Sequence, residues 1–249
     1  MNKDSILKCL DAWWNSEKDG LALKIGSELS EKEPDRPSVE TPMPESKPRL
    51  TIVDGPKMPT QGKFEAGGPR GAVIHFTSGR YDRGVQSAFE VAEYGITQGH
   101  AYWLIARDGT VVKTHEANEW GWHAGNSYWP SLGFSVSSKT IGIELLSAGR
   151  LNMKLESWFG TTVPAMETRS ITSARYKGEQ TGTYHAYTSA QEDALFELLK
   201  YLRKTFPNTF RYENVVGHDE CCQPSGRKDD PGGALSMGMP ELRRRLSNS

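Results

Sequence analysis

The sequence predicts an α/β domain, with a central mixed β-sheet flanked by helices, over residues 50–249. Apolar runs at 72–76 and 140–146 have the length and composition of buried strands. Residues 188–205 follow a capping-box pattern and carry leucines on one helical face. Because strands alternate with helices along the chain, we expect a single sheet with helices packed against it.

The remaining elements of this domain are expected from local signals. Residues 85–94 have a short helical pattern. An Asp-Gly pair at 108–109 supplies the positive φ that a tight turn needs, so it joins 101–106 and 110–113 into a hairpin. A proline near the first helical position and arginines near the end favour a last helix over 240–246.

Two segments precede the domain. Residues 1–27 are expected to form a short N-terminal helical segment, with an amphipathic pattern over 4–15. Its apolar face fits either a docking element or a helix packed against the main domain or a partner chain. Residues 28–49 are rich in proline, glutamate, lysine and serine. Because such a composition buries little apolar surface, we expect an extended linker there.

The composition excludes several classes of protein. The net charge of −1 offers no basic surface for nucleic acid. No stretch approaches the roughly 20 apolar residues of a transmembrane helix. The start of the chain lacks the apolar core of a secretory signal, so we expect synthesis in the cytoplasm. Three cysteines, two of them adjacent, provide no disulfide framework.

The chemically most informative stretch is a loop near the C-terminus. His218 begins it, and the sequence Gly-Arg-Lys-Asp-Asp-Pro-Gly at 226–232 adds Lys228 and Asp230. His75 ends an apolar run far upstream. Two histidines and one carboxylate form a three-ligand zinc set whose fourth position is open, the pattern of catalytic sites. We therefore expect His75, His218 and Asp230 to bind zinc, which makes the chain a candidate zinc hydrolase.

Two further residues would complete a hydrolase. Glu144 lies inside the apolar run 140–146, where a charge is expensive to bury without a function. A general base that activates water is such a function. Lys228 would neutralise the oxyanion that forms when water attacks a carbonyl group. The alternatives, a surface glutamate on an edge strand and a solvated lysine, remain open from these residues alone.

A set of short motifs follows one order between residues 70 and 246. They are Val73-Ile74-His75-Phe76-Thr77, Arg107-Asp108-Gly109-Thr110, Gly121-Trp122-His123-Ala124-Gly125, Ile141-Gly142-Ile143-Glu144-Leu145, Ala148-Gly149-Arg150-Leu151, Tyr187-Thr188-x-Ala190-Gln191, Val216-Gly217-His218-Asp219 and Gly226-Arg227-Lys228-x-Asp230-Pro231-Gly232. With these motifs the chain resembles the zinc-dependent N-acetylmuramoyl-L-alanine amidases of type 2. That family is related to bacteriophage lysozyme-like amidases and to peptidoglycan recognition proteins.

The resemblance implies a reaction and a role for each candidate residue. Zinc would be the cofactor, with His75, His218 and Asp230 as its ligands. Glu144 and Lys228 would be the catalytic pair. The implied reaction cleaves the amide between the lactyl group of N-acetylmuramic acid and the first L-alanine of the stem peptide. Peptidoglycan or a muropeptide is therefore the expected partner of the domain 50–249.

Three residues are expected to contact substrate. His123 matches the histidine of the family's Trp-His-Ala-Gly motif, which lines the substrate cleft. Trp122 beside it is one of several aromatic residues suited to sugar and peptide binding, although such residues also pack into cores. Tyr102 stands where many relatives have the histidine of Ser-Ala-His. A hydrogen-bonding role near the metal is expected for it if it faces the cleft together with His100.

Two departures from the family pattern leave alternatives open. The loop between His218 and Asp230 contains Cys221 and Cys222, and some relatives use a cysteine as third zinc ligand. We prefer Asp230 because it keeps the Lys-x-Asp-Pro-Gly context. The region 152–184 is long and weakly patterned, and either shapes substrate specificity or covers an edge of the sheet.

Three functions fit this set of residues. A phage or prophage-type lysin would be made in the cytoplasm and act in the periplasm or on the cell wall after release through a holin pore. The appended segment 1–49 favours this bacteriolytic function. A cytosolic recycling amidase would cleave released muropeptides at the same site. A non-catalytic peptidoglycan-recognition module is disfavoured, because the chain retains all three candidate ligands and both catalytic residues.

Overall fold

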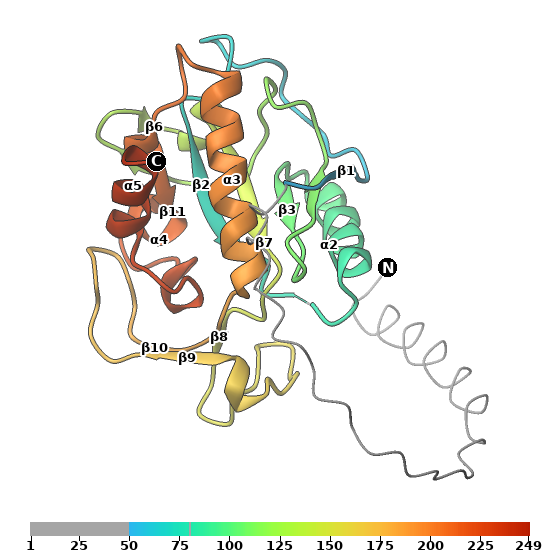
Figure 1. Cartoon of the computed structure of the whole chain (residues 1–249), viewed down its shortest axis with the longest axis vertical. Helices are drawn as coiled ribbons and strands as arrows, with labels where there is room; N and C mark the ends of the chain where they lie inside the picture. Colours follow the sequence, from blue (N-terminus) through green and yellow to red (C-terminus); the bar gives the residue numbers. More distant parts are fainter. Residues whose placement is uncertain (1–49, 80) are drawn as a thin grey trace, which may run out of the picture. The chain divides into compact units, whose positions relative to one another are not determined.

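The computed structural model describes residues 50–79 and 81–249 (Figure 1). The predicted helix over 4–15 and the predicted linker over 28–49 lie outside the described residues. Within the described part of the chain, none of the helices is long and apolar enough to cross a membrane. All of the candidate site residues fall within this part.

A six-stranded mixed sheet forms the centre of the domain (Figure 1). Its strands, in spatial order, are β1 (Ile52–Asp54), β4 (Val111–Lys113), β3 (Trp103–Ile105), β7 (Thr140–Leu145), β2 (Gly71–Phe76) and β11 (Val215–Gly217). Neighbouring strands are parallel except β3 and β4, which form the antiparallel hairpin predicted from the Asp-Gly turn. Gly109 in that turn has a φ of 87°, which explains the glycine.

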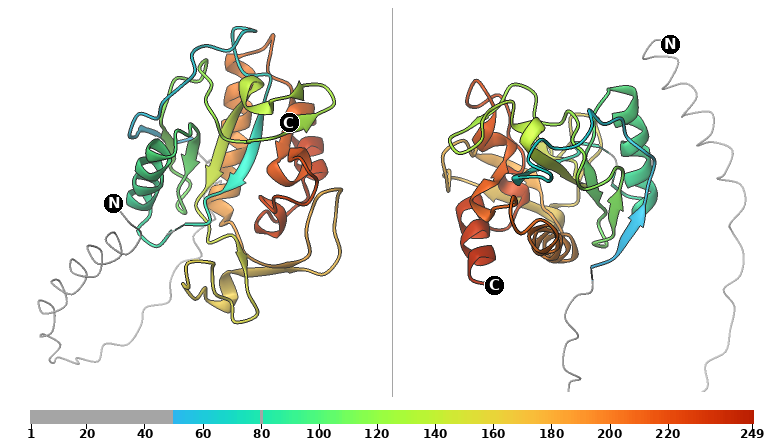
Figure 2. Two further views of the ribbon diagram at one scale, coloured as in Figure 1. Left: turned by 180° about the vertical axis from the view of Figure 1, so that it is seen from behind. Right: turned by 90° about the horizontal axis from the view of Figure 1, so that it is seen from above.

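Helices pack against both faces of this sheet (Figure 2). They are α2 (Val85–Thr97), α3 (Ser189–Thr205), α4 (His218–Cys221) and α5 (Met239–Ser247). α3 begins at the predicted capping box of Thr188 and Gln191, and its leucines are buried against one face. α2 packs against the other face at β3 and β4, and is three residues longer than predicted. The predicted fold class, a mixed sheet flanked by helices, is confirmed.

The alternation of side chains along the strands assigns the candidate site to one face. In β2, Ala72, Ile74 and Phe76 belong to the core beneath α3, so His75 points to the opposite face. β7 pairs with β2 in parallel register, with Glu144 opposite His75. Register partners on neighbouring strands point to the same face. The His75 and Glu144 side chains therefore lie next to each other, on the face away from α3.

The region 152–184 contributes two strands to a small second sheet. The order of that sheet is β8 (Arg150–Leu151), β10 (Gly182–His185) and β9 (Thr168–Ile171), all antiparallel. Figures 1 and 2 show it beyond the carboxyl ends of β2 and β7. The shorter elements are the hairpin β5 (Tyr128–Trp129) and β6 (Gly133–Phe134), and the 3-10 helices Val136–Lys139, Ala165–Glu167, Tyr212–Asn214 and Gly232–Ala234.

Candidate metal centre and active site

Three segments bring the candidate metal ligands to one edge of the sheet. His75 is the penultimate residue of β2, and β11 runs parallel to β2 as its neighbour. His218 follows β11 directly, as the first residue of α4. Parallel neighbours end at the same edge of a sheet, so the two histidines meet there. Asp230 reaches them from the loop that follows α4, just before the 3-10 helix Gly232–Ala234.

The ligand atoms of these residues form a small triangle. His75 Nδ1 lies 3.0 Å from His218 Nδ1 and 2.8 Å from Asp230 Oδ2. His218 Nδ1 lies 3.0 Å from the same oxygen, and all three residues are buried. Three ligand atoms in tetrahedral positions about 2.0–2.1 Å from one zinc ion would lie about 3.3 Å apart. The triangle therefore has nearly the dimensions that a metal ion requires.

Hydrogen bonds on the far side of each imidazole fix which nitrogen carries the proton. His218 Nε2 lies 3.0 Å from the Ala124 carbonyl oxygen, which only accepts, so Nε2 donates and Nδ1 is free. His123 Nε2 donates in the same way to the Thr140 carbonyl at 3.1 Å, which leaves its Nδ1 as an acceptor. His75 Nε2 lies 3.2 Å from that acceptor and donates to it. Both ligand Nδ1 atoms thus present lone pairs.

The electrostatic surroundings disfavour protonation of the His75 and His123 rings and of the Asp230 carboxylate. Burial and the neighbouring His218 lower the pKa of His75 to about 4. Burial, together with His75, holds the pKa of His123 well below its usual value. Burial raises the pKa of Asp230, but its contacts with His218 and His75 outweigh this and hold the pKa below its usual range. Two nitrogen lone pairs and a carboxylate without a proton between them form a cation site, and these donors fit zinc.

Neither cysteine of the loop belongs to this group. The Cys221 thiol is buried in an apolar cluster, 3.8 Å from the His218 carbonyl oxygen, and burial raises its pKa, so it stays protonated. The Cys222 thiol lies 3.7 Å from the Asp219 carbonyl oxygen. Across residues 50–79 and 81–249, the cluster of side chains that could hold a metal contains no cysteine. The geometry therefore favours Asp230 as the third ligand.

Glu144 lies beside the triangle, with an oxygen that has no hydrogen-bond partner among the described residues. β7 lies between β3 and β2, so Glu144 is not on an edge strand. Its Oε2 is buried and makes no hydrogen bond within the described part of the chain. Burial and the charge of Asp230 raise the pKa of Glu144 well above its usual value, although Lys228 opposes this shift. Such a carboxyl group is equipped to take up and release a proton.

Lys228 approaches the same group from the loop that carries Asp230. It lies two residues before that ligand and is partly exposed. Its positive charge contributes to lowering the pKa values of both Glu144 and His75, so the ammonium group lies within electrostatic range of the triangle. A cation site, a proton-accepting carboxyl group and an ammonium group at one place are the components of a metal-dependent hydrolase.

A comparison with protein families agrees with this chemistry. A family model described as N-acetylmuramoyl-L-alanine amidase matches residues 65–233, which is more than half of the chain. The chain belongs to this family. The family predicted from the sequence motifs is confirmed, and with it the prediction of an N-acetylmuramoyl-L-alanine amidase.

Several solved structures are similar to this amidase at low sequence identity. A selenomethionine AmpD derivative is 20% identical, with 79% of this chain and 93% of that chain covered and a TM-score of 0.46. The amidase LysC from Clostridium intestinale URNW is 17% identical, with 79% and 97% covered and a TM-score of 0.48. AmiD from E. coli, in complex with the substrate anhydro-N-acetylmuramic acid-L-Ala-D-gamma-Glu-L-Lys, is 22% identical, with 75% and 61% covered and a TM-score of 0.47. A search among curated proteins gave no match.

His123 of the amidase lies against the sheet, where it supports a predicted metal ligand. Its ring packs over Gly142 of β7, and a Cβ added there would come within 2.7 Å of the ring. A larger residue at this position would displace His123 and break its hydrogen bond to His75. The sequence predicts substrate contact for His123, and the structure adds an orienting contact that its motif does not reveal.

The other two predicted substrate-binding residues have different surroundings. Trp122 is 43% exposed and makes an edge-to-face contact with Trp120, with ring centroids 5.1 Å apart. It offers an open aromatic surface beside His123. Tyr102 is only 5% exposed, and its hydroxyl donates to the Val91 carbonyl of α2 at 3.3 Å. The Tyr102 hydroxyl is thus directed at a helix, and its role toward substrate stays a prediction.

Two buried residues that the sequence did not single out support the candidate ligands of the amidase. The Tyr187 hydroxyl donates to the His75 carbonyl at 3.0 Å. The Asp219 amide donates to the Asp230 carbonyl at 2.8 Å, which ties the start of α4 to the loop. Both residues lie in motifs on which the sequence resemblance rests, but their residue types alone do not indicate these contacts.

Proposed function

We propose that this amidase uses a zinc ion, held by His75, His218 and Asp230, to hydrolyse the amide between the lactyl group of N-acetylmuramic acid and L-alanine in peptidoglycan. One observation carries this proposal. Three unprotonated ligand atoms converge to within 3.0 Å of each other, beside a buried Glu144 oxygen that lacks a partner in the described region. Membership of the family supplies the substrate class.

Each residue of the site has a separate role in the proposed amide hydrolysis. A bound zinc ion supplies Lewis-acid chemistry, which polarises the amide carbonyl and favours the ionisation of water. Glu144 accepts the proton of the attacking water and returns it to the leaving nitrogen of L-alanine. Lys228 stabilises negative charge on the former carbonyl oxygen. His123 and Tyr187 hold His75 by its ring and by its carbonyl group.

A defined substrate tests the proposed bond. Zinc-loaded protein is incubated with a synthetic muramoyl peptide that begins with L-alanine, and the products are identified by mass spectrometry. The expected products are the free muramic acid carboxylate and a stem peptide with a new L-alanine amine. Cleavage within the stem peptide or at a glycosidic bond, or an intact substrate, would overturn the proposal.

Replacing Lys228 with alanine is expected to lower kcat on this substrate by about 10²–10³-fold, the effect of removing one oxyanion donor. Zinc content is expected to stay at the wild-type value, because Lys228 is not one of the three proposed ligands. Steady-state kinetics with a zinc assay measure both quantities. Lys154→Ala, which removes an exposed lysine from the region 152–184, is the control. An unchanged kcat in Lys228→Ala would rule out its proposed role.

We also propose that intact peptidoglycan, rather than a released muropeptide, is the substrate, which requires the protein to reach the wall after synthesis. The appended segment 1–49 supports this, because such segments often supply targeting. A second support is an exposed aromatic pair, Trp158 at 69% and Phe159 at 57%, with ring centroids 4.0 Å apart. The Trp158 indole donates to the Ser78 carbonyl, three residues after His75. Three residues span at most about 11 Å, so the pair lies within reach of a polymer bound at the site.

Replacing Trp158 with alanine is expected to lower activity on purified sacculi by about 2- to 10-fold, the range of one aromatic contact of about 0.5–1.5 kcal/mol. Activity on a soluble anhydro-muropeptide is expected to stay unchanged. Met166→Ala is the control, because Met166 is exposed in the same region. An equal loss on both substrates, or wild-type activity on sacculi, would contradict the role of the pair. Cleavage of muropeptides alone by the wild-type protein would favour recycling.

A further inference from the structure

Residues 168–184 lie against residues 226–236. We call residues 168–184 the clamp segment. We call residues 226–236, which carry Lys228 and Asp230, the ligand loop. Apart from the 3-10 helix Gly232–Ala234, the ligand loop contains no helix or strand. Its carbonyl groups therefore need partners from other parts of the chain. Several side chains of the clamp segment supply those partners.

Arg175 binds the part of the ligand loop that follows Asp230. Its guanidinium donates to the carbonyl oxygens of Gly232 at 3.1 Å, Leu235 at 3.2 Å and Ser236 at 3.0 Å. Glu179 holds this guanidinium in place, with an Nε–Oε1 distance of 2.9 Å and a carboxylate that is fully buried. The arginine is thus fixed on one side by a carboxylate and contacts three carbonyl groups of the loop on the other.

Gln180 binds the part of the ligand loop that precedes Asp230. Its amide nitrogen donates to the Gly226 carbonyl at 3.1 Å and to the Lys228 carbonyl at 3.0 Å. Its amide oxygen accepts a hydrogen bond from Arg150 at 3.2 Å, which fixes the orientation of the amide. Gln180 therefore holds the backbone of the proposed oxyanion-stabilising lysine itself.

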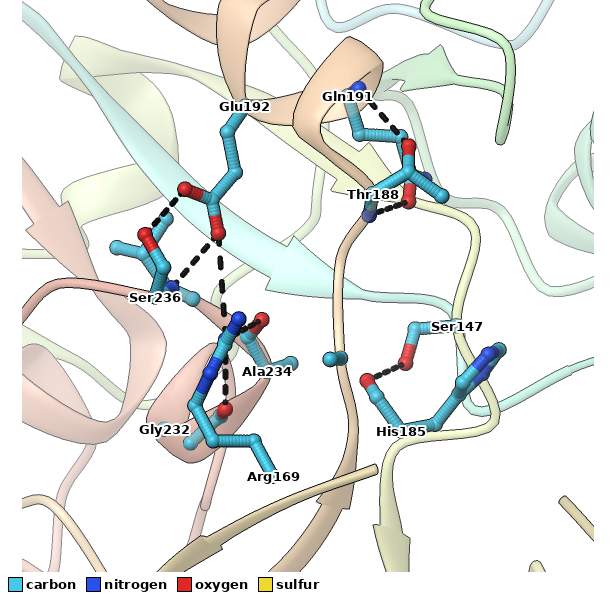
Figure 3. Close-up of polar contacts among 12 residues, drawn as sticks. Ser147, Arg169, His185, Thr188, Gln191, Glu192, Gly232, Ala234 and Ser236 are labelled. Carbon is cyan, nitrogen blue, oxygen red and sulfur yellow. Dashed lines mark hydrogen bonds and ion pairs between the residues drawn. The ribbon is translucent and has the colours of Figure 1, made fainter. Parts of the chain in front are cut away.

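Further contacts secure the ligand loop from both sides. Arg169 donates to the Ala234 carbonyl at 2.8 Å, and Glu192 of α3 accepts from the Ser236 amide at 2.7 Å (Figure 3). The Tyr176 hydroxyl donates to Asp219 at 2.8 Å, next to the ligand His218. The contacts of Arg169 and Glu192 reach the loop through its backbone, while the Tyr176 contact secures the segment before it through the side chain of Asp219.

We propose that the clamp segment sets the geometry of the active site, with Arg175 as a positioning residue for Asp230 and Gln180 as a positioning residue for Lys228. The inference rests on the proposed function of the site. Metal ligands and oxyanion donors must be held within about 0.5 Å of their productive positions. A loop with so little regular structure meets that demand only when other segments bind its backbone. The region 152–184 thus does more than cover an edge of the sheet.

Full-length protein with three single substitutions tests this proposal. Gln180→Glu keeps the size of the side chain but removes both donors, and Arg175→Met removes the guanidinium. Lys177→Ala, at an exposed position of the clamp segment, is the control. Zinc affinity is measured by competition with a chelator. The kcat and KM are measured on the muramoyl peptide, and folding is checked by thermal unfolding followed by circular dichroism.

Gln180→Glu is expected to lower kcat by about 10- to 100-fold, the scale of a 1 Å misplacement, with KM and zinc affinity close to wild type. In a Lys228→Ala background the same substitution is expected to have no further effect on kcat, because Gln180 acts through Lys228. Arg175→Met is expected to weaken zinc binding by about 10- to 100-fold, as for other residues that support metal ligands. Lys177→Ala is expected to match the wild type.

A wild-type kcat in Gln180→Glu, or an equal further loss in the Lys228→Ala background, would overturn the role of Gln180. Wild-type zinc affinity in a folded Arg175→Met variant would overturn the proposed positioning role of Arg175. If Arg175→Met does not fold, the Gln180 variants decide the proposal. Failure of the wild-type protein to cleave the muramoyl peptide would instead count against the proposed function, and the zinc affinities would still decide the role of Arg175.

Discussion

Replacing Glu144 with glutamine is expected to lower hydrolysis of a muramoyl peptide by about 10²–10⁴-fold, the usual contribution of a general base. The glutamine has the same size but no longer accepts the proton of the attacking water. Zinc content is expected to remain at the wild-type value, because Glu144 is not among the proposed ligands. Thermal stability is expected to be unchanged or higher, since the substitution removes a buried ionisable group whose Oε2 lacks a partner in the described part of the chain.

Activity, zinc content and unfolding temperature of Glu144→Gln are measured on the same preparation. Glu197→Gln, on the surface of α3, is the matched control and is expected to match the wild type in all three. Near-normal turnover in Glu144→Gln would remove Glu144 as the base. A loss of zinc together with activity would indicate that Glu144 acts on the metal site rather than on the water.

Replacing His75 or Asp230 with alanine is expected to weaken zinc binding by more than about 100-fold, which exceeds the usual effect of losing a residue that only supports a ligand. Each substitution removes one atom of the triangle formed with His218. Activity is expected to be lost with the metal. Zinc content after dialysis, and zinc affinity by competition with a chelator, measure the effect.

Asp229→Ala is the matched control for this pair, because it removes the neighbouring carboxylate of the same loop. It is expected to keep zinc. Full zinc occupancy in both His75→Ala and Asp230→Ala would mean that the ligands are elsewhere. Loss of zinc in Asp229→Ala but not in Asp230→Ala would mean that the loop presents the other aspartate.

The parts of the fold with strong local signals are predictable from the sequence. The capping box at the start of α3 and the Asp-Gly turn of the β3–β4 hairpin are confirmed, because each depends on residues close together in the chain. The small sheet beyond β2 is not predicted. Its strands are short and half-exposed, and Tyr184 and its neighbours are ordered by contacts with distant segments rather than by a repeating pattern.

In the candidate site, too, some features are predictable from the sequence and others are not. His75, Glu144 and Asp230 were predictable because each is a polar residue where an apolar strand or a glycine-rich loop gives it no obvious structural use. The contacts of His123 and Gln180 were not. His123 makes a hydrogen bond to His75 and packs over one glycine, and Gln180 binds carbonyl groups 46 and 48 positions away. Every residue has a backbone carbonyl, so the sequence does not indicate which one accepts a hydrogen bond. Such contacts can be identified only in the structure.

The most direct test of the account is the digestion of purified peptidoglycan by metal-free protein to which zinc is restored in increasing amounts up to one equivalent. The products are identified by mass spectrometry. The account predicts that release of stem peptides with a free L-alanine amine rises in proportion to zinc and reaches its maximum at one zinc per chain. Undiminished release by the metal-free protein, or cleavage of a different bond at any zinc content, would contradict it.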